Sequence, residues 1–600
     1  MNYKLSESEG KKNTTFITVF TEVNKFIGGY GKKVILLGLL ALGLILINSV
    51  INIVAPDLIG TASQNAITNR DKDALLQAVI GLVVLYVGAS AASYFQILIM
   101  GWIGQNVLSR LREKIFQKIQ SLPIAFFNEN KSGDLISRIN NDTDKLNQAL
   151  SETLLRFVGN IFIIFGIGIA MILKNPILGS FALIIALVLL VLTSLSSGIL
   201  RSINKKALEA TGNLSGELQE SLSNFKVIVA FNRRDYFKNA FGTVNESSKK
   251  NNMTSGIANN LLTPIYDFGG NLALFLIYFI GINLITAQVF TFLGVDFKSS
   301  LEFGTLISYV LYVDRFYSPL RIMASLFASI QTSLAAWSRI SELLSLKNNL
   351  GVIEDLSKDK GNEFVEFKDV SFGYNPEKMI LKHVNISLDR GKTYALVGPT
   401  GGGKSTTASL MARLYDPTEG EILLNGFNLK SYKKDDLTQK IGFILQEPFL
   451  FTGTLKENVV YGNKKYDGFD EAAMEDVLKQ KGLQRLLERF PQGLSTEVSN
   501  FTDSVSLGQK QLIAFLRVIL REPELLILDE ATANIDTITE SLLQEIIDKL
   551  PTETTKIIIA HRLNTIQKAD SIFFIANGEV SKPVKYAQAL ELINDTKKQS

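Results

Sequence analysis

The sequence contains no cysteine and only two histidines among its 600 residues. Disulfide bonds, thiolate metal sites and a histidine-rich metal centre are therefore excluded. An excess of one charge sign is also missing, because 62 Lys and Arg residues nearly balance 58 Asp and Glu residues, which leaves a formal net charge of +4. A charge this small on a chain this long gives no indication of a nucleic-acid partner.

The first 30 residues lack a short apolar core followed by small residues, so we expect no cleaved signal peptide and a cytoplasmic segment over 1–30. Hydrophobic residues make up 46% of the chain, which is high for a soluble protein and predicts a membrane part. Six hundred residues are too many for a single core, so two or more domains are expected.

Six long apolar segments lie in the first half of the chain. Each is about as long as a helix must be to cross a bilayer. A buried helix of a soluble domain is the alternative for any one of them, but six within about 330 residues leave it little room. The predicted spans cover about 34–56, 74–104, 154–173, 177–200, 261–287 and 304–327.

Basic residues predict the orientation of these spans, since cytoplasmic loops collect Lys and Arg. The second-to-third and fourth-to-fifth connections are rich in both, whereas 57–73, 174–176 and 288–303 hold few. We therefore expect both termini to be cytoplasmic. Apolar residues recur at intervals of three and four along 108–119 and 218–229, which predicts helices that continue the spans into the cytosol.

A polar, glycine-bearing stretch over 346–363 indicates a linker. Beyond it, short β-rich runs alternate with helix-length segments, which is typical of an α/β domain with a largely parallel core sheet. The expected fold is thus an all-α six-helix membrane domain over 31–345, followed by an α/β phosphate-loop domain over 364–600. The expected strands cover 364–372, 393–397, 420–424, 441–445, 525–528, 556–559 and 571–575.

A phosphate-binding loop is the clearest motif of the second half. Its spacing matches G-x-x-x-x-G-K-[ST] between a short strand and a predicted helix over 405–415. Glycines allow backbone N–H groups to curl around phosphate, Lys404 adds positive charge, and the Ser405 hydroxyl can hold Mg²⁺. The predicted ATP-binding residues here are Gly398, Pro399, Thr400, Gly401, Gly402, Gly403, Lys404, Ser405 and Thr406.

An apolar strand over 525–528 ends in two acids, Asp529 and Glu530. Asp529 can hold the Mg²⁺ water shell, and Glu530 can polarise a water molecule for attack on the terminal phosphate of ATP. A pair of solvated acids at a strand end is the alternative, and the phosphate loop upstream makes the catalytic interpretation stronger.

These motifs together resemble the nucleotide-binding domain of an ABC transporter, and residues 31–345 resemble the six-span exporter domain fused to it. The resemblance implies that Tyr374 stacks on adenine. It also implies that Gln446 serves Mg²⁺ together with Ser405 and Asp529, and that His561 contacts the γ-phosphate, so that Lys404, Glu530 and His561 form the catalytic set.

The resemblance also covers contacts between chains and between domains. Residues 533–536 match the loop that contacts the second chain, and the signature sequence faces the ATP bound by that chain. Two stretches resemble intracellular coupling segments that transmit nucleotide-driven movement by rigid contact, 123–138 and 217–234. The long cytosolic extensions favour an exporter. The signature residues are Val505, Ser506, Leu507, Gly508 and Gln509.

The signature departs from the family pattern, because Val505 and Leu507 replace the usual Leu and first Gly. In two-gene bacterial exporters, an intact acid pair and a weakened signature commonly occur on one chain and the reverse on the other. The chain is thus expected to be the Glu530-bearing half of a heterodimer, with a homodimer as the alternative.

Charged residues lie inside two predicted spans: Asp267 near Asn271 in the fifth, and Asp314 next to Arg315 in the sixth. Such charges face the bundle interior or an aqueous path because they are costly in lipid. A transport pathway and an ion pair such as Asp267 with Arg315 are both open. The substrate is open too, between small molecules, lipids and small peptides. A lipid flippase, a small-peptide exporter and an ATP-gated regulator or channel are the alternatives to general export.

Overall fold

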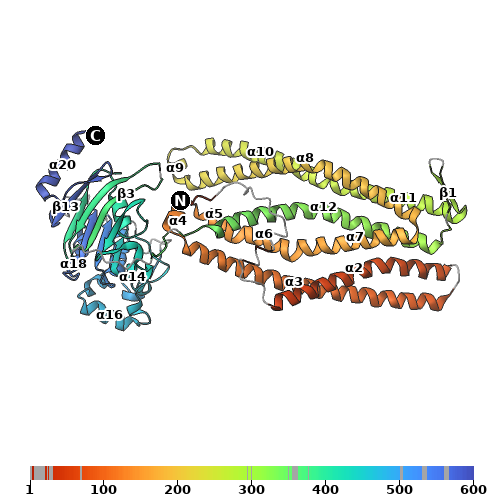
Figure 1. Ribbon diagram of the computed structural model, residues 1–600, viewed down its shortest axis with the longest axis horizontal. Coiled ribbons are helices and arrows are strands. Elements are labelled where there is room, and N and C mark those ends of the chain that lie inside the picture. Colours follow the sequence, from red (N-terminus) through yellow and green to blue (C-terminus); the bar gives the residue numbers. More distant parts are fainter. Residues whose placement is uncertain are drawn as a thin grey trace. The chain divides into compact units, whose positions relative to one another are not determined.

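The chain divides into two compact units in its computed structural model (Figure 1). One unit contains Lys4–Ser121 and Asn130–Leu346, and the other contains Met1–Tyr3, Leu122–Glu129 and Lys347–Ser600. The structure describes residues 3–5, 21–22, 25, 32–67, 71–292, 295–298, 300–348, 350–353, 363–375, 377–446, 448–499, 505–529, 537–559 and 566–599.

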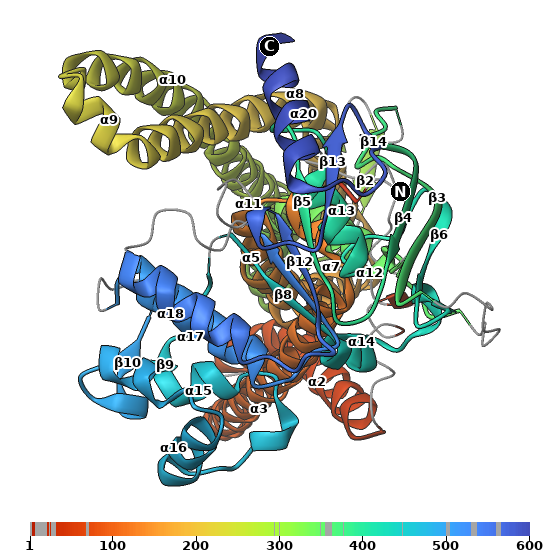
Figure 2. The same ribbon diagram turned by 90° about the vertical axis from the view of Figure 1, so that its left-hand side faces the viewer.

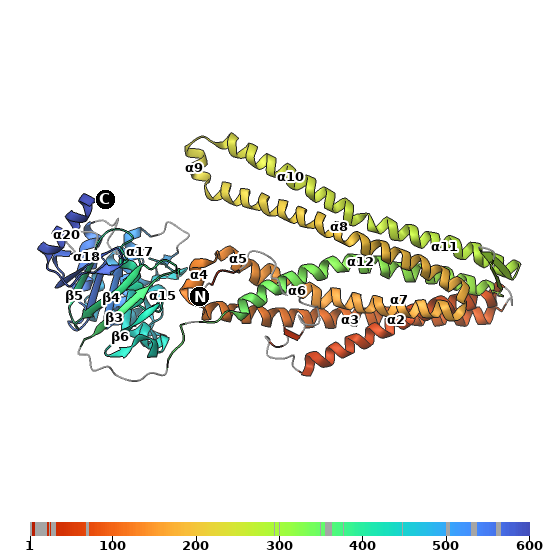
Figure 3. The same cartoon turned by 45° about the horizontal axis from the view of Figure 1, so that its top comes forward.

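The first unit is a bundle of long helices that run side by side (Figures 1 and 3). Shorter helices form bends between the long ones, and the hairpin of β1 (Val289–Phe292) and β2 (Val295–Lys298) precedes the last long helix. The short helices are α5 (Ser132–Ser137), η1 (Arg138–Asp142), α6 (Thr143–Gln148), η2 (Ala149–Thr153) and α9 (Phe225–Ala230). The long helices are α2 (Lys32–Ile67), α3 (Lys72–Ser121), α7 (Leu154–Lys174), α8 (Pro176–Ser223), α10 (Arg234–Asn260), α11 (Leu262–Thr286) and α12 (Phe303–Ser345).

Two of these helices are far longer than a bilayer requires. The 50 residues of α3 and the 48 of α8 correspond to about 75 and 72 Å of helix, against a hydrocarbon core of about 30 Å. The helix predicted over 108–119 is confirmed as part of α3. The one predicted over 218–229 is interrupted at Asn224, whose side chain donates to the Glu220 carbonyl at 3.1 Å where α8 ends and α9 begins.

Five helical stretches in the described part of the chain are long and apolar enough to span a membrane. They are 32–67, 72–121, 132–174, 176–223 and 234–286, which contain the first five predicted spans. Helix α12 contains the sixth predicted span but is not among the five. Its outer part holds Asp314, Arg315 and Arg321, and these charges lower the hydropathy of the segment.

Buried tyrosines fasten α12 to the turn between α7 and α8. The Tyr309 hydroxyl donates to the Asn175 carbonyl at 2.8 Å and accepts the Asn175 N–H at 2.9 Å, while the Tyr317 hydroxyl donates to the Ala182 carbonyl at 2.7 Å. A hydroxyl held in an apolar core requires such partners, because an unpaired one costs its full desolvation. The apolar core of this unit gathers around these tyrosines.

The second unit contains a six-stranded sheet with the order β14-β13-β5-β12-β11-β8 (Figure 2). All neighbours are parallel except β13 and β14. The strands are β5 (Thr393–Val397), β8 (Ile441–Ile444), β11 (Leu525–Asp529), β12 (Thr555–Ile559), β13 (Ser571–Ala576) and β14 (Glu579–Val580). The central strands are buried on both faces, which accounts for their continuous apolar sequences. The predicted α/β domain with a largely parallel core sheet is confirmed.

A separate antiparallel sheet has the order β4-β3-β6-β7 and contains two of the predicted strands. Its strands are β3 (Val365–Phe372), β4 (Leu381–Leu388), β6 (Glu419–Leu424) and β7 (Phe427–Asn428). The unit also contains α4 (Ile124–Glu129), α13 (Lys404–Met411), α14 (Lys434–Lys440), β9 (Gly453–Thr454), α15 (Leu455–Val460), α16 (Glu471–Gln480), β10 (Glu497–Val498), α17 (Leu507–Ile519), α18 (Thr537–Asp548) and α20 (Tyr586–Gln599).

Three stretches that are distant in sequence make up this second unit. The Tyr3 N–H donates to the Glu129 carboxylate at 2.7 Å, and the Tyr3 hydroxyl donates to the Lys347 carbonyl at 3.2 Å. Tyr3 is only 3% exposed. The N-terminal residue Tyr3 thus joins the end of α4 to the start of the predicted linker.

Helices α2 and α12 approach each other closely at Gly60 and Gly304. A Cβ atom at Gly60 would lie 2.0 Å from the Ser308 hydroxyl and 2.3 Å from the Gly304 carbonyl oxygen. We expect Gly60→Ala to destabilise the bundle by about 1–3 kcal/mol, because the added methyl group overpacks the contact. Samples are heated to a series of temperatures, and the monodisperse protein that remains is measured by size-exclusion chromatography. The temperature at which half is lost reports the change. Gly43→Ala in the same helix is the matched control, since nothing lies within 4 Å of Gly43; equal midpoints for the two variants would contradict the close contact.

Candidate nucleotide-binding site

The phosphate loop connects β5 to α13 in a conformation that glycine makes possible. Gly398, Gly401 and Gly403 have φ values of 141°, 81° and 113°, a region that other residues rarely adopt. A Cβ atom at Gly398 would lie 2.0 Å from the Ile575 carbonyl oxygen of β13. Glycine is therefore required both by the backbone conformation and by the close approach of the neighbouring strand.

Lys404 is the first residue of α13 and is 6% exposed. Its ammonium group donates to the carbonyl oxygens of Gly398 and Pro399 at 3.0 and 2.9 Å. The positive charge thus lies inside the curl of the loop, beside the N-terminal N–H groups of α13. A helix N-terminus and a fixed cation together favour an anion such as a phosphate chain.

Oxygen ligands gather at the C-terminal edge of the parallel sheet. The Ser405 hydroxyl lies 3.4 Å from the carboxylate of Asp529, the last residue of β11. Strand β8 is parallel to β11 and pairs Ile444 with Leu528, so Gln446 follows β8 at the same edge as Asp529. A hydroxyl, a carboxylate and an amide oxygen are ligands that Mg²⁺ accepts, and the described residues hold no cluster of three His, Cys, Asp or Glu that would suit another metal.

Three aromatic side chains form a cluster beside the loop. The Tyr374 ring lies 5.0 Å from the Tyr415 ring and 5.1 Å from the Phe372 ring, both edge-on. The Tyr374 hydroxyl is 3.3 Å from the Thr406 hydroxyl of α13, and Tyr374 is 49% exposed. One ring face is therefore available to a base whose phosphates occupy the loop.

Helix α13 is shorter than predicted. The sequence predicts a helix over 405–415, but α13 ends at Met411, and Arg413 has a left-handed backbone with φ of 50°. The Arg413 side chain compensates by binding Asp416 at 3.2 Å and the Tyr432 carbonyl at 3.1 Å. This turn releases Tyr415 from the helix and allows it to pack on Tyr374.

Tyr415 also contacts the first coupling segment. Helix α4 lies within this segment, and the Asn128 amide donates to the Tyr415 hydroxyl at 2.7 Å. Burial raises the pKa of the Tyr415 hydroxyl, although the bond from Asn128 opposes the shift, so the phenol keeps its proton at neutral pH. Sequence reasoning missed both residues, because neither belongs to a motif and only the fold brings them together.

The rest of the stretch that resembles a coupling segment is held by ion pairs around one buried arginine. Arg138 is 1% exposed and binds the carboxylates of Asp134 and Glu342 at 2.9 and 3.1 Å. It also donates to the Arg339 carbonyl at 2.7 Å, while the Arg339 side chain binds Asp134 at 2.6 Å. The segment over 132–138 is therefore clamped to the C-terminal part of α12.

The signature sequence lies at the start of α17. The Ser506 hydroxyl accepts the Gln509 N–H at 3.2 Å, and the Gln509 side chain accepts the Ser506 N–H at 2.8 Å, which forms a capping box. Val505 packs into the apolar core of the helical part, and Gly508 is buried. Leu507, by contrast, is 45% exposed.

Other predicted site residues lie outside the described part of the chain. These are Glu530, His561 and the predicted contact loop over 533–536. Strand β11 leads directly to Glu530, and β12 ends at Ile559, two residues before His561. Because β11 and β12 are adjacent and parallel, both residues follow strands that end at the same edge of the sheet.

Charges in the membrane bundle are paired differently from the sequence expectation. The ion pair of Asp267 with Arg315 was wrong, because Asp267 binds Arg321 at 2.5 Å. Arg321 lies in the sixth predicted span, almost two helical turns beyond Arg315. Arg315 instead donates to the Asn52 side-chain oxygen at 2.7 Å.

Comparison with known proteins agrees with this arrangement. A family described as the ABC transporter transmembrane region matches residues 38–312, and one described as ABC transporter matches residues 381–533. An uncharacterized ABC transporter ATP-binding protein, YfiC of Bacillus subtilis, is 31% identical over 90% of this chain and 88% of its own length. The chain is a member of the ABC transporter family. This ABC transporter binds ATP, couples its hydrolysis to export, and is a multi-pass membrane protein.

Two further relatives have similar coverage. A probable multidrug resistance ABC transporter ATP-binding/permease protein, YheH of Bacillus subtilis, is 29% identical over 86% of this chain and 76% of its own length. A fatty acid ABC transporter ATP-binding/permease protein of Mycobacterium tuberculosis is 29% identical over 85% of this chain and 78% of its own length. The similarity to these proteins extends over both halves of this transporter.

The aromatic cluster yields a test on ATP affinity. We expect Tyr415→Ala to raise the KM for ATP by about 2- to 10-fold, because Tyr374 loses the ring that orients it. Tyr415→Phe is the matched control, since it keeps the ring and removes only the hydroxyl, and its KM should stay near that of the native protein. Steady-state ATPase kinetics of the reconstituted protein measure both. Equal KM values for the Ala and Phe variants would show that the ring does not position Tyr374.

Proposed function

We propose that this chain is one half of a two-chain exporter, and that its own phosphate loop forms the more active of two ATP sites. The observation that carries the proposal is the exposed side chain of Leu507 at the N-terminus of α17. The same chain has a complete phosphate loop. In the family, the signature of one chain covers the ATP of the other. An isobutyl group where glycine is usual obstructs the approach of a phosphate to the N–H groups of α17.

The proposed division of the chain follows from this function. Residues 1–30 form a cytoplasmic segment, 31–345 the membrane domain with six spans, 346–363 the linker, and 364–600 the nucleotide-binding domain. The basic connections between spans support cytoplasmic termini and a cytoplasmic nucleotide-binding domain. Export is favoured over an ATP-gated regulator, since YheH is named a probable multidrug resistance permease protein.

The site residues have distinct proposed roles in hydrolysis. Lys404 holds the terminal phosphates from within the loop, and Tyr374 stacks on adenine. Ser405, Gln446 and Asp529 would hold Mg²⁺, which neutralises charge on the phosphates when bound. Glu530 orients and polarises the attacking water molecule, and His561 contacts the γ-phosphate. The position of Lys404 and the proximity of Ser405 to Asp529 support these assignments.

Closure of two chains around ATP would drive alternating access. Nucleotide biases an equilibrium between two states of the membrane bundle, and hydrolysis resets it. The bond between Asn128 and Tyr415 places the first coupling segment one ring away from the proposed adenine platform. Movement of this platform therefore reaches α4 through two direct contacts.

Expression of the chain alone tests the pairing. We expect it to hydrolyse ATP slowly alone and Leu507→Gly to raise this rate by about tenfold, which corresponds to roughly 1.4 kcal/mol of activation free energy. Val505→Leu is the control, because residue 505 is buried away from the surface of α17. A stable homodimer of the native chain with full ATPase activity, unchanged by Leu507→Gly, would contradict the heterodimer.

Replacement of the proposed catalytic acid tests the chemistry. We expect Glu530→Gln to lower ATP turnover by about 100-fold or more while ATP binding persists, since the amide cannot polarise water. Trapping of radiolabelled ATP by filter binding, alongside release of phosphate, separates the two effects. Turnover close to that of the native protein would remove Glu530 from the catalytic set.

A further inference from the structure

Three basic residues lie within the six predicted membrane spans, and one of them differs from the other two. Arg156 binds Glu152 at 2.8 Å, and Arg321 binds Asp267 at 2.5 Å. Among the residues that the structure describes, Arg315 has no carboxylate partner, although Asp314 is its neighbour in sequence. Within the described ranges, its guanidinium group donates only to the neutral Asn52 side chain, and the Arg315 side chain is exposed.

Arg315 lies near the middle of the sixth predicted span. It follows Gly304, where α12 packs against α2, by eleven residues, or about 16 Å of helix, which is roughly half of the hydrocarbon thickness. A charged side chain at this depth is costly, and such residues mark substrate or ion pathways when they face an interior surface. Among the described residues, no carboxylate lies within ion-pair distance of Arg315, so a bound anion would stabilise its charge at this depth.

A chain of amide groups holds the guanidinium group in place. The Asn52 amide donates to the Asn48 side-chain oxygen at 2.8 Å, and the Asn48 amide donates to the Ser93 hydroxyl at 2.5 Å. Helices α2, α3 and α12 are linked in this way at one level. These neutral partners orient Arg315 but contribute no negative charge. A guanidinium group has five N–H donors in a planar fork that suits carboxylate and phosphate groups.

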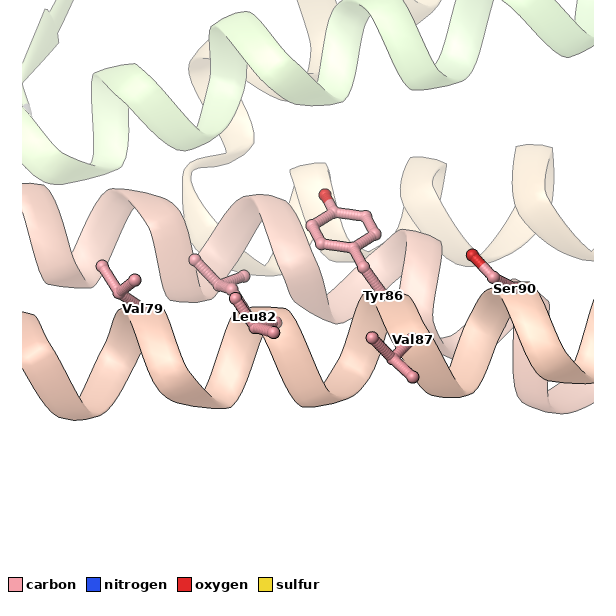
Figure 4. A pocket seen from close by; sticks show the side chains of 6 residues that line it. Val79, Leu82, Tyr86, Val87 and Ser90 are labelled. Atoms are coloured by element: carbon pink, nitrogen blue, oxygen red, sulfur yellow. The ribbon is translucent and has the colours of Figure 1, made fainter.

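A shallow apolar groove on the surface of α3, open along its length, begins one helical turn from this polar chain. Its volume is about 460 Å³. Figure 4 shows Val79, Tyr86 and Ser90 on the same side of α3, and Ser90 lies three residues before Ser93. The surface thus passes from apolar side chains to the amide groups and then to the cation. The groove is lined by Val79, Leu82, Val83, Tyr86, Val87 and Ser90.

We propose that Arg315, oriented by Asn52, binds the anionic headgroup of an exported amphiphile, a carboxylate or a phosphate, and that its alkyl chain lies along the α3 groove. The proposal rests on the proposed export function and specifies its substrate class. Charge complementarity selects the occupant: a neutral amphiphile would leave Arg315 without a counter-ion, and a cationic one would be repelled. Headgroup and chain are recognised by separate parts of the site.

Binding to the full-length protein tests the headgroup site without ATP. The protein is placed in phosphatidylcholine nanodiscs, in the oligomeric state in which it purifies, and bound oleate, dodecyl phosphate and oleyl alcohol are measured by scintillation proximity against empty nanodiscs. We expect the two anions to bind more tightly than the alcohol by about tenfold or more. Arg315→Gln should abolish this preference, Arg315→Lys should keep part of it, and the paired Arg156→Gln should leave it unchanged.

The two anions and one further substitution separate the parts of the proposal. Preference for oleate alone identifies a carboxylate amphiphile, and preference for dodecyl phosphate alone a phosphate amphiphile. Val83→Trp should fill the groove and weaken the anions and the alcohol alike. If Val83→Trp binds all three ligands as the native protein does, the proposed position of the alkyl chain is wrong. A second polypeptide chain would then cover the groove.

Two results would overturn the headgroup site. One is equal binding of the anions and the alcohol by the native protein. The other is a preference for the anions that persists in Arg315→Gln, since the headgroup would then be bound by another group of the transporter. ATPase activity is measured in parallel: absence of even the slow hydrolysis expected of the chain alone would contradict the proposed function and leave the binding result intact.

Discussion

The rest of the structure depends on the need of a buried charge for a partner. Removing a charged group from water costs several kcal/mol, and only an opposite charge with good hydrogen-bond geometry recovers that cost. Arg138 satisfies this constraint with two carboxylates and a carbonyl group, and by doing so it binds the coupling segment to α12. Two ion pairs that are only partly buried add to this: Lys174 binds Asp57 where α7 ends, and Arg321 binds Asp267 where α11 meets α12. The long helices are thus joined at several levels by interactions that tolerate little displacement, which suits rigid elements that transmit movement.

Nucleotide recognition depends on backbone conformation more than on side chains. The loop curls because Gly398, Gly401 and Gly403 adopt conformations that other residues avoid, and Lys404 is held inside that curl by carbonyl groups. The surface proposed to bind the adenine base has a different origin. It exists because α13 ends at Met411, which allows Tyr415 to support Tyr374. One short helix therefore determines both ends of the nucleotide-binding surface, one through its N-terminal N–H groups and the other through its early termination.

The sequence predicted those parts of the fold and site that depend on local pattern. Strands β5 and β11 are largely apolar runs, and the phosphate loop has a fixed spacing, so both could be recognised without a structure. The pairing of side chains across the helical bundle could not be recognised from the sequence. Asp267 was matched with the nearest arginine by position, Arg315, and the structure pairs it with Arg321, because the rotation and depth of two packed helices decide which side chains meet. The contact of Asn128 with Tyr415 spans 287 residues of sequence and follows from no local signal.

The nucleotide-binding unit is discontinuous in sequence, since α4 and Tyr3 belong to it together with Lys347–Ser600. Its N-terminal stretch is fastened to its other two stretches by Tyr3, and its middle stretch is fastened to Tyr415 by Asn128. A fragment that begins at the linker would consequently be an incomplete domain, with the Tyr415 hydroxyl and the Lys347 carbonyl deprived of native partners.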